Sequence, residues 1–235
     1  VLLFDLGGVI IDIDPLNTIK EFQKKSSKPS GSFEGLDYRY SKNDSELMSF
    51  FYEYEKGLVS ESEFREGLRK LGKINLNDSK IDKIWNLGIV KINEELLNYI
   101  VSLNERYSIM ILSNTNSIHR KYFDTLVTNL YGKNFNQIFN RVYYSYELGL
   151  RKPEKEIYEF VVKDSGFLSN EILFFDDIKE NIESCENVGM KGYKVNNIFD
   201  ALYSTYGYGY DWNGYQAYYW PGATRNYFMT ISYLI

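Results

Sequence analysis

The 235-residue sequence has little cysteine, almost no alanine and no excess of positive charge. Its single cysteine, Cys185, cannot form an intramolecular disulfide, which favours a reducing compartment such as the cytoplasm. With 27 basic and 32 acidic residues the formal net charge is −5, so nothing electrostatic indicates a nucleic-acid partner. No uncharged apolar run approaches the ~20 residues that a membrane-spanning helix needs. We therefore expect a cytoplasmic protein that binds a small molecule and neither nucleic acid nor membrane.

What is present is an ordinary globular composition, 44% hydrophobic and 25% charged, which excludes disordered and fibrous classes. Short apolar runs, mostly separated by helical patterns, predict parallel strands that are covered by helices on both faces. These runs are Leu2–Phe4, Ser108–Leu112, Ile138–Tyr144, Ile172–Phe175 and Gly192–Val195. The predicted fold class is α/β, with a doubly wound, Rossmann-like parallel sheet.

A stretch of roughly ninety residues between the first two runs shows helical periodicity and no convincing strand, and it is too long for a simple crossover. Ser60, with Glu63 in a capping box, and Asn77 are typical helix N-caps within this stretch. We therefore predict a helical cap domain at 15–91, inserted after the first strand of a core domain. The core domain is predicted to comprise 1–14 and 92–200.

Residues 201–235 differ in composition from the rest, since they hold all three alanines and nine of the 22 tyrosines. A stacking surface for nucleic acid would also need cations, and Arg225 is the only one in this segment. We interpret 201–235 as a Tyr/Gly-rich extension of unknown role, either an appended strand pair or a segment unrelated to the fold. The oligomeric state stays open.

Acidic side chains follow two of the predicted strands. Asp5 comes directly after the first, and Asp176 and Asp177 come directly after the fourth. Ligands bind at the carboxyl edge of open parallel sheets, and adjacent acids there are costly unless a cation or hydrogen bonds hold them. Hard oxygen ligands favour Mg²⁺ as that cation.

Two further segments bring phosphate-binding chemistry to the same edge. Ser113, followed by Asn114, ends the second predicted strand and supplies a hydroxyl and free N–H groups where a helix would begin. Lys152 precedes Pro153, which we expect to open a helix, so its ammonium can point into the same crevice. Taken singly, each of these residues also has a structural interpretation as a turn acid, a helix cap or a solvated side chain.

Four segments together resemble the motifs of the haloacid dehalogenase superfamily in order and in position at strand ends. They are Phe4–Val9, Leu112–Thr115, Arg151–Glu154 and Phe174–Asp177, and the resemblance covers residues 1 to about 198. In the detail of these motifs the sequence is most similar to bacterial α-D-glucose-1-phosphate phosphatases within that superfamily. The resemblance implies Mg²⁺-dependent hydrolysis of a small phosphomonoester, a sugar phosphate such as glucose 1-phosphate.

The resemblance also implies roles for individual residues. Asp5 would be the nucleophile that forms an aspartyl-phosphate, and Mg²⁺ would be held by Asp5, Asp176 and the carbonyl of Gly7. Ser113 and the N–H of Asn114 would bind phosphoryl oxygens, and Lys152 would stabilise the transition state. Asp177 would contact metal-bound water or orient Lys152. Asn181 would support the residues of the site without itself contacting the substrate.

Gly7 departs from the superfamily pattern, because most phosphatases of that superfamily carry an acid/base aspartate at this position. Three interpretations stay open. The leaving group could need little protonation, as an anomeric sugar oxygen does; Asp12 or Asp14 could supply the proton; or the site could bind esters without turning them over. The last would make the protein a catalytically weak phosphate-ester-binding or scaffold protein. The only histidine, His119, is interpreted as a packing residue.

Overall fold

The computed structural model describes residues 1–28, 33, 46–195, 211–212 and 215–216. The chain divides into two compact units, Val1–Val195 and Asn196–Ile235, which are described separately. None of the helices in the described part of the chain is both long and apolar enough to cross a bilayer.

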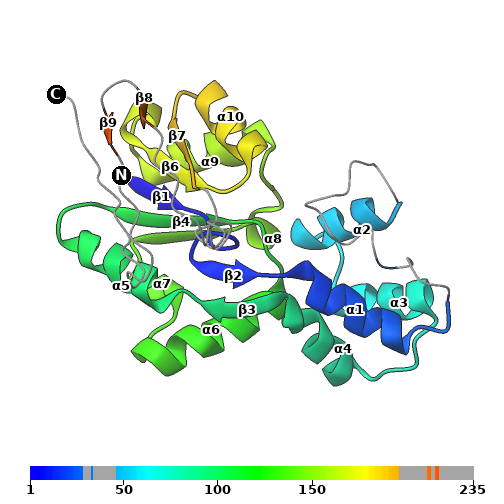
Figure 1. The fold of residues 1–235 in the computed structure, drawn as a ribbon. Helices are drawn as coiled ribbons and strands as arrows, with labels where there is room; N and C mark the ends of the chain where they lie inside the picture. The colour runs from blue at the N-terminus through cyan, green and yellow to red at the C-terminus, as the bar shows by residue number, and fades with distance from the viewer. Residues whose placement is uncertain (29–32, 34–45, 196–210, 213–214, 217–235) are drawn as a thin grey trace. The chain divides into compact units, whose positions relative to one another are not determined.

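A five-stranded parallel sheet forms the centre of the first unit, in the order β5-β4-β1-β6-β7 (Figure 1). The strands are β1 (Leu2–Phe4), β4 (Ile109–Ser113), β5 (Arg141–Tyr144), β6 (Leu173–Asp176) and β7 (Lys191–Lys194). Every residue of β1 and β4 is buried, as expected for strands covered on both faces. The predicted parallel α/β fold is confirmed.

Helices cover both faces of this sheet, with α9 and α10 on one side and α5, α6 and α7 on the other (Figure 1). They are α5 (Glu94–Ser102), α6 (Ser117–Tyr131), α7 (Phe135–Ile138), α8 (Ser145–Leu148), α9 (Lys155–Ser165) and α10 (Lys179–Asn187). The described residues also include short 3-10 turns at η2 (Asn86–Gly88), η3 (Leu103–Glu105) and η4 (Ser169–Glu171).

One predicted strand was wrong in its first half. The run Ile138–Tyr144 begins inside α7 and becomes β5 only from Arg141. The reason is a capping box, in which Asn134 and Gln137 bond each other's main-chain N–H groups and start a helical turn.

Between β1 and α5, the described residues form four α-helices that lie together beyond one end of the sheet (Figure 1). They are α1 (Pro15–Lys25), α2 (Glu46–Glu55), α3 (Glu61–Gly72) and α4 (Asp78–Trp85). The capping box at Ser60 and the cap at Asn77 are present as predicted. We refer to residues 15–91 as the insert.

The insert has an apolar cluster of its own, which extends to Ile118 at the start of α6. Its buried members from the insert are Ile19, Phe22, Phe33, Met48, Phe51, Tyr54, Phe64, Leu68, Ile74, Ile81, Ile84 and Trp85. Helical segments of this length are marginal alone in water, so this packing stabilises them.

Two short strands were not predicted. β2 (Ile11–Ile13), just before the insert, pairs antiparallel with β3 (Ile89–Ile92), which spans the end of the insert. Strands this short carry too few residues for an alternating pattern to stand out in the sequence.

In the second unit, the described residues form one antiparallel pair, β8 (Asp211–Trp212) with β9 (Tyr215–Gln216). A strand pair was one of the two interpretations of this tyrosine-rich segment. The boundary predicted at residue 200 and the other residues of the extension lie outside the described residues.

Candidate active site

The carboxyl ends of two neighbouring strands bring the predicted aspartates together. β1 pairs with β6 in a register that sets Phe4 beside Phe175, and the two rings stack with centroids 4.7 Å apart. The N–H of Asp5 then donates to the carbonyl of Phe175 at 2.9 Å, so Asp5 and Asp176 end adjacent strands at one edge. Both side chains are buried.

Lys152 lies between these two carboxylates. Its Nζ is 2.9 Å from Oδ1 of Asp5 and 2.7 Å from Oδ2 of Asp176, and its side chain is only 1% exposed. Burial of an ammonium is costly, and the two carboxylates more than offset that cost, because the pKa of Lys152 is raised despite its burial. Pro153 does not open a helix as predicted: α9 begins at Lys155, and Lys152 and Pro153 lie in the turn before it.

Asn114 contacts the same lysine through its side chain. Its Oδ1 accepts the N–H of Lys152 at 2.8 Å, and its Nδ2 donates to the carbonyl of Lys152 at 2.8 Å. The prediction gave Asn114 a phosphate-binding N–H only, so this side-chain contact is an additional finding. Ser113, the last residue of β4, is buried beside it, and its hydroxyl lies 3.5 Å from the carbonyl of Asn114.

Asp176 is held in place by several donors. Nδ2 of Asn181 lies 2.9 Å from both of its carboxylate oxygens, and the N–H of Ile178 donates to Oδ1 at 2.8 Å. Asn181 is itself buried. It therefore orients Asp176 instead of contacting a substrate, in line with its predicted indirect role.

The three acids form a group suited to a cation. Asp5, Asp176 and Asp177 each present a carboxylate oxygen within 4.8 Å of the other two. Burial raises the pKa of Asp5 well above its usual range, although Lys152 opposes the shift, and burial raises the pKa of Asp177 to about 6, with Asp176 adding to the effect. When all three acids are ionised, their negative charge exceeds the positive charge of Lys152 by two, and a divalent cation bound by hard oxygen ligands would balance that excess. The residues present therefore fit Mg²⁺.

Gly7 and Gly8, in the loop after Asp5, differ in backbone conformation and in the space available for a side chain. Gly8 has a φ of +76°, and the Asp177 carboxylate lies so close that any side chain at Gly8 would collide with it. Gly7 is not in a glycine-only conformation, and a Cβ there would lie 3.4 Å from Cδ1 of Ile13, an ordinary contact. The backbone at position 7 therefore tolerates a Cβ atom, in contrast to position 8.

The two carboxylates considered as replacements for that acid have structural partners. Asp14 is the N-cap of α1 and accepts the N–H of Leu16 at 3.1 Å. Asp12 lies opposite Lys91 in the β2–β3 pair, with the charged atoms 3.7 Å apart. These contacts favour structural roles for both.

His119 packs as interpreted from the sequence. Its ring stacks on Trp85 of the insert, with centroids 5.0 Å apart, and its Nε2 lies 3.2 Å from the carbonyl of Trp85. Its Nδ1 lies 3.2 Å from Nδ2 of Asn116. Burial lowers the pKa of His119 to about 4, so the ring is neutral at pH 7.

The sequence analysis assigned no role to two residues that lie beside the site. Arg151, directly before Lys152, forms an ion pair with Glu55 at the end of α2, at 2.9 Å. Both side chains are mostly buried, which nothing in the local sequence indicated. A charged residue that closes an apolar helix such as α2 is expected to face solvent, and only the packing of the insert against the sheet buries Glu55.

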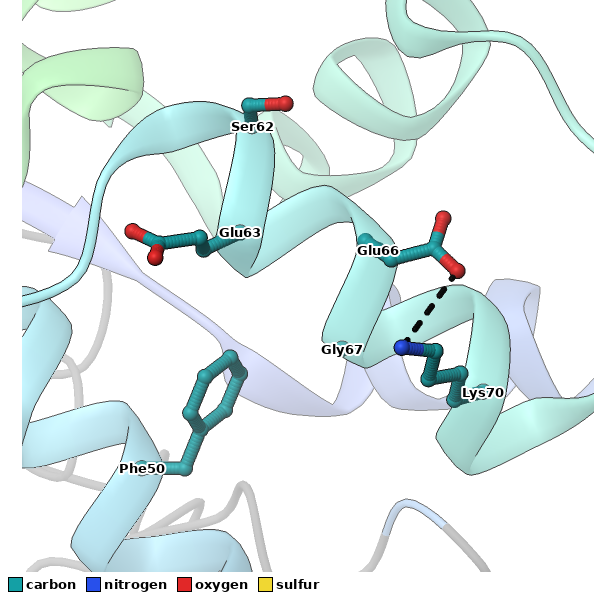
Figure 2. Close-up of a pocket in the computed structure, with 6 residues that line it drawn as sticks. All are labelled: Phe50, Ser62, Glu63, Glu66, Gly67 and Lys70. Carbon is teal, nitrogen blue, oxygen red and sulfur yellow. Dashed lines mark ion pairs between the residues drawn. The ribbon is translucent and has the colours of Figure 1, made fainter.

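A separate groove of about 390 Å³ lies on the insert between α2 and α3 (Figure 2). Its lining residues are Phe50, Ser62, Glu63, Glu66, Gly67 and Lys70, and Glu66 and Lys70 form an ion pair across 3.8 Å. None of these residues is one of the acids, amides or cations around Asp5. The groove is therefore not part of the candidate active site.

Residues 1–189 match the family model of the haloacid dehalogenase-like hydrolases. The chain belongs to that family, so the resemblance to the haloacid dehalogenase superfamily is confirmed, whereas the more specific similarity to glucose-1-phosphate phosphatases is not.

Two relatives from Bacteroides thetaiotaomicron are similar over most of the chain. A D-ribitol-5-phosphate phosphatase is 31% identical over 199 residues, which are 85% of this chain and 93% of the relative. The crystal structure of a HAD family enzyme in complex with magnesium and inorganic phosphate is 32% identical, with a TM-score of 0.73 over 84% of this chain and 94% of that one. A HAD-like family hydrolase from Porphyromonas gingivalis is 29% identical, with a TM-score of 0.72 over 84% and 91%. These likenesses support a phosphatase of this family.

Proposed function

We propose that this protein is a Mg²⁺-dependent phosphomonoester hydrolase whose substrate is a small sugar or polyol phosphate. The observation that carries the proposal is the buried Lys152 ammonium between Asp5 and Asp176 at the carboxyl edge of the sheet. A structural protein has no physical need for a cation and acids that converge in this way. The family and the similarity to a phosphatase support the same conclusion.

Asp5 is the nucleophile in this proposal. Both hydrogen bonds that the structure shows for its carboxylate, from the N–H of Leu6 and from Lys152, fall on Oδ1, so Oδ2 is the oxygen that attacks phosphorus. The new O–P bond forms as the bond from phosphorus to the alcohol oxygen breaks, giving an aspartyl-phosphate. Water then hydrolyses it to inorganic phosphate and restores Asp5.

The surrounding residues stabilise the charge of this reaction. Lys152 balances negative charge on the phosphoryl oxygens, and Ser113 and the N–H of Asn114 donate hydrogen bonds to them. Asp5, Asp176 and the carbonyl of Gly7 would hold Mg²⁺, which would neutralise charge between the nucleophile and the phosphoryl group. Asp177, beside Gly8, would contact metal-bound water.

The leaving group decides which substrates react fastest in this proposal. With glycine at position 7 and structural partners for Asp12 and Asp14, the departing oxygen takes its proton from water. Esters with a less basic leaving oxygen, such as glucose 1-phosphate, then react faster than esters of ordinary alcohols. The related D-ribitol-5-phosphate phosphatase makes polyol phosphates the second class to compare.

The insert is proposed to act as a cap that selects the substrate and excludes water, with 1–14 and 92–200 as the core domain. The apolar cluster of the insert, to which the described buried residues of the core domain contribute only Ile118, supports this division. The residues around Phe33 to Tyr54 are expected to set specificity, and 34–45 of these lie outside the described residues. The free, buried Cys185 fits the reducing cytoplasm proposed for the protein.

Phosphate release from glucose 1-phosphate, D-ribitol 5-phosphate and related esters, with Mg²⁺ and with EDTA, tests the proposal. We expect metal-dependent turnover that falls at least about 1,000-fold in Asp5→Asn, which keeps the shape of the side chain but removes the nucleophile. Asp164→Asn, at a surface ion pair with Arg141, is the matched control and should retain activity.

The alternative is a phosphate-ester-binding or scaffold protein, favoured by the missing acid at Gly7. In that case no ester in the panel would release phosphate above the rate of Asp5→Asn, while Mg²⁺ and a phosphate ester would still raise the melting temperature. That outcome would reject hydrolysis and retain binding.

A further inference from the structure

An ion pair joins the insert to the loop that carries Lys152. Nε and Nη2 of Arg151 both donate to Oε2 of Glu55, at 3.2 and 2.9 Å, across 96 residues of chain. The side chains are 14% and 9% exposed. Burial raises the pKa of Glu55, and Arg151 opposes this shift. Removing one partner would leave the other charge buried without compensation.

A second residue of α2 holds the same guanidinium. The Cζ atom of Arg151 lies 3.8 Å from the ring centroid of Tyr52, a cation–π contact. Tyr52 and Glu55 are three residues apart, so they share one face of the helix. One helix of the insert therefore contacts Arg151 through both a ring and a carboxylate.

The last residue of α2 and the residues just after it pack closely against the start of α8, which follows β5 of the central sheet. The hydroxyl of Ser145 donates to the carbonyl of Glu55 at 2.6 Å and accepts the N–H of Thr115, in the loop after β4, at 2.9 Å. Gly57 lies so close to the carbonyl of Tyr146 that a side chain there would collide with it. The end of α2 is thus docked against the start of α8, and the hydroxyl of Ser145 links it to the loop after β4.

Arg151 and Lys152 are consecutive but point to different partners. Arg151 reaches the insert, whereas Lys152 reaches Asp5 and Asp176, and its main chain is bonded on both sides by Asn114. A displacement of Arg151 must therefore be transmitted through one peptide unit to the lysine that lies between the reacting groups.

We propose that Glu55 and Arg151 are positioning residues, which couple docking of the insert to the placement of Lys152 against Asp5. The effect that we expect on catalysis rests on the proposed hydrolase function. The effect that we expect on the loop at Lys152 does not. When the insert is docked, the ion pair holds the loop at Lys152. When the pair is broken, the loop relaxes and the ammonium is no longer held for the transition state.

A matched comparison exists within the same interface. Lys121 of α6 pairs with Glu61 of α3, so this ion pair also joins a helix that covers the central sheet to the insert. The lysine side chain, however, is 70% exposed. Exposed pairs contribute little to stability. Lys121→Ala therefore removes an ion pair between the same two parts of the chain without reaching Lys152.

The test compares Glu55→Gln, Arg151→Lys and Lys121→Ala with the wild type. We expect kcat to fall about 10-fold in Arg151→Lys, with KM within about twofold, because small displacements of a transition-state group affect kcat and not ground-state binding. Glu55→Gln keeps an acceptor oxygen and should lose less, and Lys121→Ala should match the wild type. Thermal melts establish that each variant folds.

Amide hydrogen exchange supplies a readout that needs no turnover. The N–H of Lys152 donates to Asn114, and the N–H groups of Gly57 and Leu58 close the end of α2 by bonding Tyr54 and Glu53. We expect these amides to exchange at least several-fold faster in Glu55→Gln and Arg151→Lys, and at wild-type rates in Lys121→Ala.

Two results would overturn the proposal. One is wild-type exchange at Lys152 in both Glu55→Gln and Arg151→Lys; the other is a lower melting temperature in these variants with kcat unchanged. If the wild type releases no phosphate from any ester, the proposed function fails by itself. Faster exchange at Lys152 in the two variants, but not in Lys121→Ala, would still establish the coupling.

Discussion

The side chain of Asn114 bonds both main-chain groups of Lys152, accepting its N–H and donating to its carbonyl, each at 2.8 Å. This reciprocal pair fixes the backbone from which the lysine reaches Asp5. Asn114 lies in the loop after β4 and Lys152 in the turn before α9, so the contact also ties these two segments together.

Asn114→Asp tests this contact. The substituted side chain still accepts the N–H of Lys152, but it cannot donate to the carbonyl and places a charged oxygen against it. We expect kcat to fall about 10-fold and stability by about 1–2 kcal/mol. Steady-state kinetics and urea unfolding measure both. Asn98→Asp, at a surface contact with Tyr131, is the control, and equal kcat in both variants would contradict the role of Asn114.

Metal binding should stabilise the folded protein through Asp176. We expect saturating Mg²⁺ to raise the melting temperature of the wild type by roughly 5 °C relative to EDTA. In Asp176→Asn the rise should be lost, because the amide supplies no negative charge to the cation. Asp164→Asn should keep it. A rise of the same size in Asp176→Asn would show that the cation binds elsewhere.

Glycines 7 and 8 should respond differently to alanine. Gly8→Ala places a side chain at positive φ against Asp177, so we expect a loss of about 1–2 kcal/mol or more and a loss of activity. Gly7→Ala has room beside Ile13 and should fold with near wild-type stability. Thermal melts of the two variants decide the comparison, and equal destabilisation would contradict it.

Gly7→Asp should supply the missing acid. A Cβ at position 7 makes only an ordinary contact with Ile13, and we expect an aspartic acid built on it to protonate the leaving oxygen. We expect turnover of D-ribitol 5-phosphate to rise about 10-fold relative to glucose 1-phosphate, because the latter has less need of an acid. An unchanged ratio of the two rates would show that leaving-group protonation does not limit the reaction.

His119 should make stability depend on pH. The pKa of its imidazole is 6.5 in an unfolded chain and about 4 in the folded protein, so between these values the unfolded state binds the proton and the folded state does not. The contribution of His119 to the free energy of unfolding is fully present above pH 6.5 and is lost as the pH falls toward 4. At pH 5 the loss is about 2 kcal/mol. Urea unfolding at about pH 7.5 and pH 5 measures the change, and His119→Gln should lose less over that range. An identical loss in both proteins would contradict the assignment.

The sheet and the edge at which the candidate site lies could be predicted because the signals are local. An apolar run that ends in Asp5, and another that ends in Asp176 and Asp177, mark strand ends, and parallel pairing brings those ends to one edge. The short strands β2 and β3 could not be predicted in this way. They form because the segment before the insert and the end of the insert lie side by side, and pairing across 75 or more residues leaves no pattern within either segment.

By itself, the sequence determined the α/β class, the helix caps at Ser60 and Asn77, the family and the set of residues that converge at the sheet edge. Only the tertiary structure decided that Asn114 bonds the backbone of Lys152 and that Glu55 is buried against Arg151. The reason is physical: periodicity and capping act between neighbours in the chain, whereas the partner and burial of a charged side chain depend on segments that meet only when the fold is complete.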